Sequence, residues 1–354
     1  MKGSATDWNS SKCRTTSSEP SLRTAAIQIQ IDKAILATTI SQVSQAIKMQ
    51  TFSDDQVRQL AKPDEIIHAI RNAFARDFHA TLRMPVRSQI ELAGSILLLM
   101  PCFDEELHAA GVKIVSVSAK TGVNATYALL DAETGKVRAV LEANYLTDQR
   151  TAATSAVATD FLARNDARTL GVFGAGRQAV AHFTMLRHVR DFQQFFVCGS
   201  GRSDLTAFVS RMKTEHGIQV EAVDAETCVR KSDVLCTCTT STEPLLKGEW
   251  LRPGAHLNLV GAFQPHTREV DDEAVRRARV VVDTFEGALE EAGDLLIPIN
   301  KGIVDASHVI ADLHQIVSGK VIGRTSANDI TLFKSVGCAL EDLVTAKLIF
   351  DKIF

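Results

Sequence analysis

The 354-residue sequence contains no CxxC pair, and its seven cysteines are an odd number. Cys236 and Cys238 stand two positions apart in one apolar stretch and Cys198 lies in another, which is too few thiols for a four-ligand metal site. We therefore expect no metal site. We expect the thiols to be free and buried in strands. Such cysteine usage is typical of a reducing compartment, so we expect the protein to be cytoplasmic.

The sequence also lacks long apolar runs and an excess of charge of one sign. The longest apolar candidate, Ile96–Met100, has the length of a strand, whereas a membrane span needs about 18 residues. Lysine and arginine number 39 and aspartate and glutamate number 42, which gives a net charge of −3. This balance excludes general attraction to nucleic acid or to an anionic membrane, so any bound anion must be held by local groups.

The length favours two domains, and the first 48 residues differ from the rest. Residues 1–48 are rich in serine and threonine and poor in acids. They can be a disordered tail, a transit peptide for organelle import, or sequence upstream of a true start at Met49. We favour the third, because Met49 directly precedes a capping-box pattern, Ser53 to Gln56, and then apolar residues at helical spacing.

Two kinds of pattern follow one another along the remaining chain. Short β-like runs occupy residues 86–143 and end in a hairpin, which indicates a meander. A helix is expected over 147–164, and from Thr169 onward strands alternate with helices, which predicts an α/β fold with a parallel sheet covered by helices. The last twenty residues, Ser335–Phe354, are expected to form one amphipathic helix.

A glycine motif marks a candidate dinucleotide site. The motif GxGxxA is formed by Gly174, Ala175, Gly176, Arg177, Gln178 and Ala179. It follows the apolar strand that ends at Phe173 and opens a helical stretch. Gly174 would allow the tight turn, Gly176 would let the backbone approach a pyrophosphate, and the small Ala179 would permit close packing of helix on strand. Because strand, turn and helix are in register, we predict a nicotinamide dinucleotide cofactor.

The end of the next predicted strand indicates which cofactor is used. An acid at this place would bind the ribose 2′-hydroxyl of NADH, but no acid occurs before Asp204. The segment offers Ser200, Arg202 and Ser203 instead, which suit a 2′-phosphate. We therefore expect NADPH to be preferred, with NADH possible; the alternative is that Arg202 is a solvated loop cation.

Three cations stand isolated among apolar or small residues upstream of the glycine motif: Arg87, Lys113 and Arg150. Lys113 interrupts a predicted strand, where an unpaired charge is costly unless it faces an anion or a wet cleft. The three side chains could together bind one carboxylate. From the spacing alone, a shared carboxylate site and three ordinary surface cations are equally good interpretations.

Several segments together resemble the ornithine cyclodeaminase/μ-crystallin family: LTDQRTAA, GVFGAGRQA, EPLLKGEWLRPGAHLNLVGA, REVDD, EAGDL and DITLFKSVGCALEDLVTAKL. The resemblance extends from about Met49 to the C-terminus. It implies a Rossmann-type doubly wound parallel sheet in residues 147–326 and an α+β substrate-binding and dimerisation domain in residues 49–146 together with 327–354. It also implies a homodimer in which Arg87, Lys113 and Arg150 hold the substrate carboxylate.

One position separates the activities of this family. The ornithine cyclodeaminases carry an aspartate in a segment of the form VGGD-x-P, and alignment on Pro265 places Phe263 there. The segment GAFQPHTREVDD is similar to that of the ketimine reductases, which reduce Δ1-pyrroline-2-carboxylate to proline and Δ1-piperideine-2-carboxylate to pipecolate. A phenylalanine suits the methylenes of a cyclic imine better than a free ammonium group.

The expected site follows from this resemblance. Lys113 is the candidate catalytic proton source, with a pKa lowered by the neighbouring arginines, and His266 is the second candidate. Thr151, Val336 and Gly337 are implied as cofactor contacts. Asp312 also matches a family motif, and we assign it no role beyond a cap or cleft contact.

Three functions remain in competition at this point. The first is an NAD(P)H-dependent imine reductase acting on a small cyclic imino acid. The second is another enzyme of the family, either a redox-neutral cyclodeaminase or an amino-acid dehydrogenase, and Phe263 argues against the cyclodeaminase. The third is a non-catalytic binding protein like μ-crystallin, which the complete set of cations disfavours.

Overall fold

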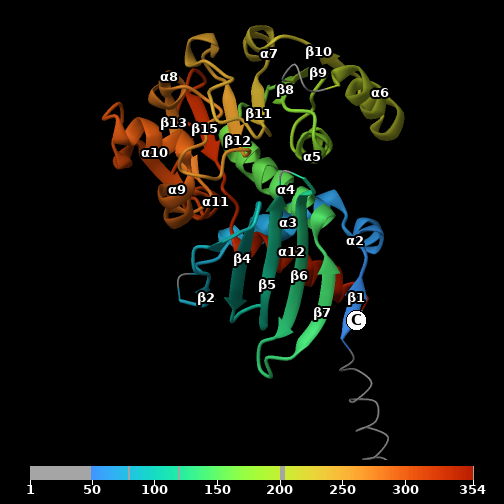
Figure 1. Cartoon of the computed structure of the whole chain (residues 1–354). Helices are drawn as coiled ribbons and strands as arrows, with labels where there is room; N and C mark the ends of the chain where they lie inside the picture. The colour runs from blue at the N-terminus through green and yellow to red at the C-terminus, as the bar shows by residue number, and fades with distance from the viewer. Residues whose placement is uncertain (1–48, 79, 119, 200–203, 354) are drawn as a thin grey trace, which may run out of the picture. The chain divides into compact units, whose positions relative to one another are not determined.

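Two β-sheets organise the part of the chain that the computed structural model describes, residues 49–78, 80–118, 120–199 and 204–353 (Figure 1). The first sheet contains β1 (Gln50–Phe52), β2 (Leu82–Arg83), β3 (Ser88–Leu92), β4 (Ser95–Asp104), β5 (Ala109–Ser118), β6 (Gly122–Asp131) and β7 (Val137–Glu142). Its order is β1-β7-β6-β5-β4-β2, with β3 also paired to β4. Every pair is antiparallel except β1 with β7, so the predicted meander is confirmed.

The second sheet is parallel throughout. It contains β8 (Thr169–Phe173), β9 (Gln194–Cys198), β10 (Val220–Ala222), β11 (Val234–Thr237), β12 (His256–Leu259), β13 (Ala278–Val282), β14 (Val309–Asp312) and β15 (Ile330–Lys334). The order is β10-β9-β8-β11-β12-β15-β13-β14. Its central strands are buried on both faces, as expected for a parallel sheet covered by helices. The predicted α/β fold class with a Rossmann-type parallel sheet is confirmed.

The helices divide between the two sheets. Those at the first sheet are α2 (Asp54–Leu60), α3 (Pro63–Ala75), α4 (Asn144–Leu162) and α12 (Ala339–Asp351). Those that follow strands of the parallel sheet are α5 (Arg177–Met185), α6 (Leu205–His216), α7 (Ala225–Lys231), α8 (Asp272–Arg277), α9 (Phe285–Glu291), α10 (Gly293–Asn300) and α11 (Leu313–Val317), with single 3-10 turns at Leu186–His188, Gly248–Trp250 and Ala306–His308. The predicted capping box is present, because Ser53 and Gln56 exchange side-chain and backbone hydrogen bonds at the start of α2.

Helix α4 connects the two sheets and is buried along most of its length. It packs against α3 and α12 on one side and against α5, β12 and β15 on the other (Figure 1). Small side chains such as Ala152, Ala153 and Ala156 allow this close packing, and all three are fully buried. Polar side chains on α4 therefore need partners within the protein, and this requirement positions part of the site described below.

The C-terminal segment differs from its prediction. The final helix begins at Ala339 rather than Ser335, because Gly337 has a left-handed φ of +84° and Cys338 is the N-cap. Residues 330–334 form β15, which inserts between β12 and β13 of the parallel sheet, although the prediction assigned 327–354 as a whole to the other domain. Only α12 then packs on α3, α4 and the strands of the first sheet. The exact domain boundaries stay a prediction, and the predicted extension 1–48 lies outside the described residues.

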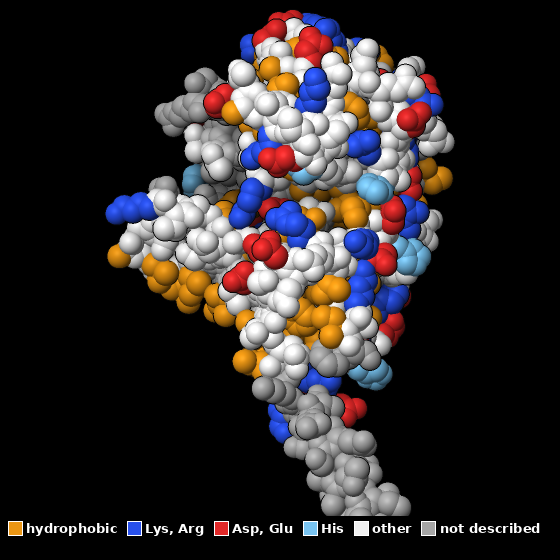
Figure 2. All heavy atoms as spheres, turned by 90° about the vertical axis from the view of Figure 1, so that its right-hand side faces the viewer, with side chains coloured by type: hydrophobic (Ala, Val, Ile, Leu, Met, Phe, Trp, Pro, Cys, Tyr) orange, Lys and Arg blue, Asp and Glu red, His pale blue; other side chains and the backbone are white. Residues whose placement is uncertain are grey.

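One face of the seven-stranded sheet is apolar and carries no helix of the described chain. On β4 and β5, residues such as Leu98 and Met100 are buried beneath helices, whereas the alternate residues Leu97, Leu99 and Ile114 are partly or largely exposed. Figure 2 shows hydrophobic side chains gathered at the left edge of the lower part of the surface, the side toward which this sheet faces. Within the described residues, no helix is both long and apolar enough to cross a membrane.

Candidate active site

A cavity of about 220 Å³ lies between the two sheets. Residues that follow β11, β12 and β15 line it from the carboxyl ends of the parallel strands, where open α/β sheets bind their ligands. Residues of β4, β5 and α4 line it from the other side. The cavity is therefore built from segments that are far apart in the sequence.

Lys113 enters this cavity from β5, opposite Met100 on β4. Its side chain is 1% exposed, and Nζ donates a hydrogen bond of 2.8 Å to Oδ1 of Asp342 on α12. Burial, followed by the charge of Arg150, lowers the pKa of Lys113 to about 8 against the opposing effect of Asp342. The lowered pKa agrees with the sequence prediction, but its largest cause is burial rather than the arginines.

Arg150 reaches the same cavity from α4 and is paired with two acids. Its Nη1 donates to Glu341 at 2.5 Å, and Nε lies 2.9 Å from Oδ1 of Asp342. Gly337 packs against the guanidinium so closely that a Cβ atom there would lie 2.6 Å from Nη1. Both this contact and the positive φ of Gly337 require glycine, so the segment before α12 is shaped around Arg150.

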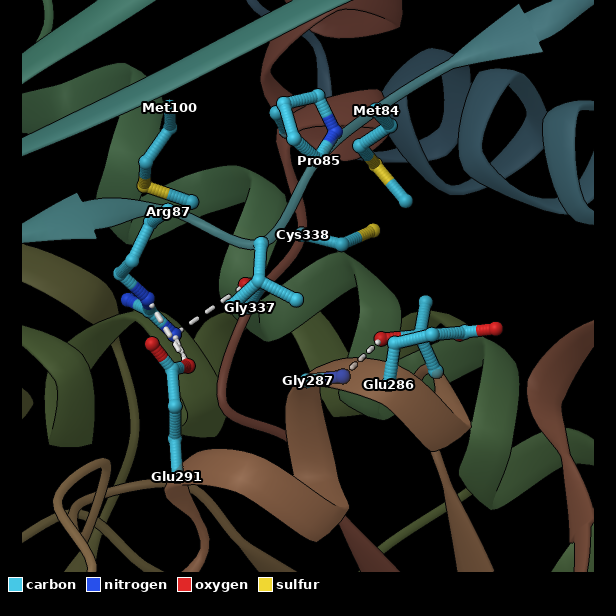
Figure 3. A pocket seen from close by; sticks show the side chains of 12 residues that line it. Met84, Pro85, Arg87, Met100, Glu286, Gly287, Glu291, Gly337 and Cys338 are labelled. Atoms are coloured by element: carbon cyan, nitrogen blue, oxygen red, sulfur yellow. Dashed lines mark hydrogen bonds and ion pairs between the residues drawn. The ribbon is translucent and has the colours of Figure 1, made fainter.

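Arg87 approaches from the chain that leads into β3, and Figure 3 shows it pointing toward Glu291 of α9. Its Nε and Nη2 donate to one carboxylate oxygen of Glu291 at 3.0 and 2.6 Å, and Nη2 also donates to the Val336 carbonyl at 2.6 Å. The guanidinium carbon lies 5.9 Å from the ring centre of Phe263, within cation–π range. Arg87 thus joins the first sheet to the segments after β12 and β15.

The structure therefore brings Arg87, Lys113 and Arg150 to one cavity, and none of them is an ordinary surface cation. Sequence reasoning missed the acids behind them: Glu291, Glu341 and Asp342. A signal existed for two of them, because Glu341 and Asp342 are adjacent acids flanked by apolar residues on both sides in the sequence, and both are fully buried. These acids orient the cations and offset the cost of burying their charges.

The glycine motif has the geometry that a dinucleotide pyrophosphate requires. Gly174 has a φ of +111°, and a Cβ atom there would lie 2.6 Å from the Cys238 carbonyl oxygen. Gly176 is the N-cap of α5 without a side-chain cap, and a Cβ atom on it would meet nothing within 4 Å. Ala179 is fully buried, as close packing of helix on strand demands. These residues fit the phosphates of a nicotinamide dinucleotide at the start of α5.

The residues after Gly176 interact with a further acid that sequence reasoning missed. Arg177 is half exposed and lies 3.3 Å from a carboxylate oxygen of Asp148, and Gln178 donates to the other oxygen at 3.1 Å. Burial raises the pKa of Asp148 to about 6 against the opposing charge of Arg177. The contacts of Arg177 and Gln178 with Asp148 connect the start of α5 to α4. Ala175, within the glycine turn, is partly buried.

The other predicted residues divide into three groups. Thr151, Val336, Gly337 and Phe263 line the cavity. Ser200, Arg202 and Ser203 lie outside the described residues. His266 is exposed and does not line the cavity, while Asp312 caps α11 through a capping box with Gln315. The structure therefore places the second proton-source candidate away from the cations, and it gives Asp312 a capping role.

Comparison with known proteins decides the family. The model of the ornithine cyclodeaminase/mu-crystallin family matches residues 48–354. The chain belongs to this family. It is 35% identical over 315 residues to a Delta(1)-pyrroline-2-carboxylate reductase of Bacillus cereus, covering 86% of this chain and 96% of that protein. It is 34% identical to the ketimine reductase mu-crystallin of Rattus norvegicus, covering 78% and 88%.

A solved structure of the same family has the same fold. It is the Delta(1)-pyrroline-2-carboxylate reductase of Thermococcus litoralis in complex with NADH and L-proline, with a TM-score of 0.83 and 37% identity over 86% of this chain and 97% of that one. The family resemblance read from the sequence is confirmed, as is its closeness to the reductases. The cavity of this family member, with its three cations and its glycine turn, is therefore its candidate active site.

Proposed function

We propose that this protein reduces small cyclic imino acids with a nicotinamide cofactor, converting Δ1-pyrroline-2-carboxylate to L-proline and Δ1-piperideine-2-carboxylate to L-pipecolate. The observation that carries the proposal is the distribution of charge in the cavity. Three cations face it, whereas no aspartate or glutamate of the described residues lines it. Such a cavity suits a ligand with one carboxylate and no second charged amine.

The walls of the cavity favour a ring over an open-chain diamine. Leu98, Met100, Val115 and Phe263 provide apolar surface beside the cations. The methylenes of a five- or six-membered imine would bury against this surface. The side-chain ammonium of ornithine would find no carboxylate there, because the acids of the site lie behind the cations and are paired with them. This argues against the cyclodeaminase as the main activity.

Each residue then has a role that follows from its place. We assign binding of the substrate carboxylate to Arg87, Lys113 and Arg150, and contact with the ring to Phe263. The glycine turn at 174–176 and the cavity-facing Thr151 and Val336 would hold the cofactor, whose nicotinamide supplies the hydride when bound. Lys113 holds the proton that the imine nitrogen needs, because a buried amine with a lowered pKa releases it readily.

The direct test is to incubate the protein with NADPH or NADH and each cyclic imine, following loss of the reduced cofactor by absorbance. We expect turnover of at least one imine. A parallel reaction with ornithine and catalytic NAD⁺ should release no comparable amount of ammonia. Ammonia release from ornithine together with no turnover of either imine would establish the cyclodeaminase instead.

The activity should depend on the charge of Lys113. The protonated amine binds the carboxylate and donates the proton, so kcat/KM should be highest below the pKa of Lys113, about 8, and fall as the pH rises through it. The measurement is kcat/KM for the imine across the neutral and alkaline range, with cofactor binding measured separately at each pH. A flat profile through this range would remove Lys113 as the proton source.

The preference for NADPH is a proposal that is supported by the sequence at Ser200, Arg202 and Ser203. Replacing Arg202 by alanine should raise KM for NADPH more than KM for NADH, because only NADPH carries the 2′-phosphate. Steady-state kinetics with both cofactors measures the difference. An equal response of the two cofactors would show that Arg202 does not bind the 2′-phosphate.

We further infer a homodimer formed through the apolar outer face of the seven-stranded sheet. Leu99 and Ile114 pair directly across β4 and β5 on this face, and Ile114 is 40% exposed. Sedimentation velocity should give twice the mass of the chain, and the double variant Leu99→Glu/Ile114→Glu should give a monomer. Ile322→Glu, at a loop residue that is more exposed than Ile114, is the control and should leave the dimer intact. A monomeric wild-type protein would contradict the inference.

We propose a cytoplasmic location. The proposal is supported by the six described cysteines, which are all free thiols, including Cys198, Cys236 and Cys238.

A further inference from the structure

A buried carboxylate outside the cavity, that of Glu269, accepts an unusual number of hydrogen bonds. Its Oε1 accepts from the backbone N–H and the hydroxyl of Thr239 at 2.8 and 2.7 Å. Its Oε2 accepts from the Thr237 hydroxyl and the Gly261 N–H, both at 2.7 Å, and from the Ala262 N–H at 3.2 Å. The side chain is fully buried, and all five partners are neutral donors. Glu269 does not line the cavity and has no part in the roles proposed for the cavity residues.

The partners of Glu269 belong to the two segments that form one wall of the cavity. Thr237–Thr240 begins with the last residue of β11, and its residues 238–240 line the cavity. Gly261–Phe263 follows β12, with Gly261 and Phe263 lining the cavity. A Cβ atom on Gly261 would overlap the Thr239 carbonyl and approach Glu269. The two segments are therefore in direct contact, and the Glu269 carboxylate bridges them.

A second buried group holds Glu269 and the same loop from the other side. Asp294 of α10 accepts from the backbone N–H of Glu269 at 2.7 Å and from Nζ of Lys334 at 2.9 Å. Lys334, at the end of β15, donates in turn to the Ala262 carbonyl. Both the N–H and the carbonyl of Ala262 are thus bound by fully buried charged side chains. The backbone just before Phe263 is therefore held by hydrogen bonds on both sides of Ala262.

We propose that Glu269 is the positioning residue that sets the wall formed by Thr237–Thr240 and Gly261–Phe263 against the substrate ring. The inference depends on the proposed function, because it assigns to Glu269 the placement of Phe263 and of the strand ends near the reacting atoms. It acts through these segments and touches neither substrate nor cofactor. A fixed wall maintains the geometry on which kcat depends, and displacement by about 1 Å can lower rates on the order of 10²-fold.

The replacement Glu269→Gln is the informative variant. A glutamine has the same shape, but one of its two terminal groups is an NH₂ donor, and in either orientation this donor faces a backbone N–H, that of Thr239 or that of Gly261. The wall must then shift or lose hydrogen bonds. Thr237→Val is the milder companion, because it removes one hydroxyl donor at nearly constant volume and leaves the other four hydrogen bonds.

Asp233 supplies a control in the same sheet, and its carboxylate is in addition ion-paired with Arg164 and Arg252. Its carboxylate accepts from the backbone N–H groups of Arg168 and Thr169 and from the Thr169 hydroxyl, so it bridges β8 and β11 as Glu269 bridges β11 and β12. It does so at the amino ends of the strands, on the edge opposite the cavity. Asp233→Asn should therefore lower the melting temperature without a comparable effect on catalysis.

The experiment compares kcat, KM for the imine, the Kd of NADPH and the melting temperature in the wild type and the three variants. We expect Glu269→Gln to lower kcat on the order of 10²-fold with the Kd of NADPH within about threefold, and Thr237→Val to lower kcat less. Asp233→Asn should keep the kcat of the wild type, even if its melting temperature falls as much as that of Glu269→Gln or more. Equal kcat in Glu269→Gln and Asp233→Asn would overturn the proposal.

Amide hydrogen exchange tests the same inference without relying on activity. Glu269→Gln should accelerate exchange in the peptides that contain Thr239 and Gly261–Ala262, and Asp233→Asn should do so around Thr169. If the wild type turned over neither imine, the proposed function would fail, while this result would still decide whether Glu269 holds the wall. Unchanged exchange at Thr239 and Gly261–Ala262 in a folded Glu269→Gln protein would exclude that role.

Discussion

Replacing Lys113 by methionine should lower kcat/KM for the cyclic imine on the order of 10³-fold while leaving NADPH binding within about twofold. The variant loses a charged contact to the carboxylate and the proposed proton source in one step. The methionine side chain keeps most of the apolar stem of the lysine, so the cavity keeps its shape. Steady-state kinetics and a fluorescence titration with NADPH measure the two quantities.

A loss of stability must be separated from this loss of activity. Lys113→Met leaves Asp342 buried with Arg150 as its remaining described ion-pair partner, and breaking a buried ion pair costs about 3–5 kcal/mol. The double variant Lys113→Met/Asp342→Asn removes both members of the pair and should recover much of the stability but none of the activity. It should also lack the decline in kcat/KM near pH 8. Lys347→Met, on the exposed side of the same helix α12, is the surface control.

An alternative result would change the assignment. If Lys113→Met kept kcat and raised only KM, Lys113 would bind the carboxylate without supplying the proton. If it retained both constants, the cavity would not be the site of the reaction.

Replacing Arg150 by alanine should lower kcat/KM on the order of 10²-fold, mainly through a higher KM for the imine. Arg150 is the cation with the most extensive buried pairing, and its guanidinium is fixed by Glu341, Asp342 and the close approach of Gly337. A pre-oriented guanidinium binds a carboxylate with little loss of side-chain entropy, so its removal weakens substrate binding more than cofactor binding. The Kd of NADPH should stay within about twofold.

Chemical rescue provides the decisive control for Arg150. Added guanidinium ion should partly restore kcat/KM in Arg150→Ala, because the deletion leaves a space next to Glu341 that fits the ion. It should not affect Arg168→Ala, at an exposed arginine on the far side of the parallel sheet. An Arg150→Ala protein with unchanged kcat/KM would remove Arg150 from the carboxylate site.

Much of the fold could be predicted from local sequence because its signals are local. The strand at Thr169–Phe173 has the same bounds in the prediction and in the structure, because an apolar run followed by GxGxxA specifies strand, turn and helix at once. The C-terminal helix was placed four residues too early, because the apolar periodicity continues through Ser335–Cys338 while the backbone is bent around Arg150. The strand β15 was missed because nothing local indicates that it inserts between β12 and β13.

The sequence by itself determined the family, the fold class, the glycine turn and the three cations. Each of these is recognised from the residue types within short segments of the chain. Only the tertiary structure decided that Arg87, Lys113 and Arg150 meet in one cavity, each paired with at least one acid. Lys113 and Asp342 are 229 positions apart, and Arg87 and Glu291 are 204 apart. Such pairs form because a buried charge requires a partner, but the partner is chosen by packing. For the same reason the role of Glu269 could not be predicted from the sequence. Its five donors come together only when the ends of β11 and β12 lie side by side.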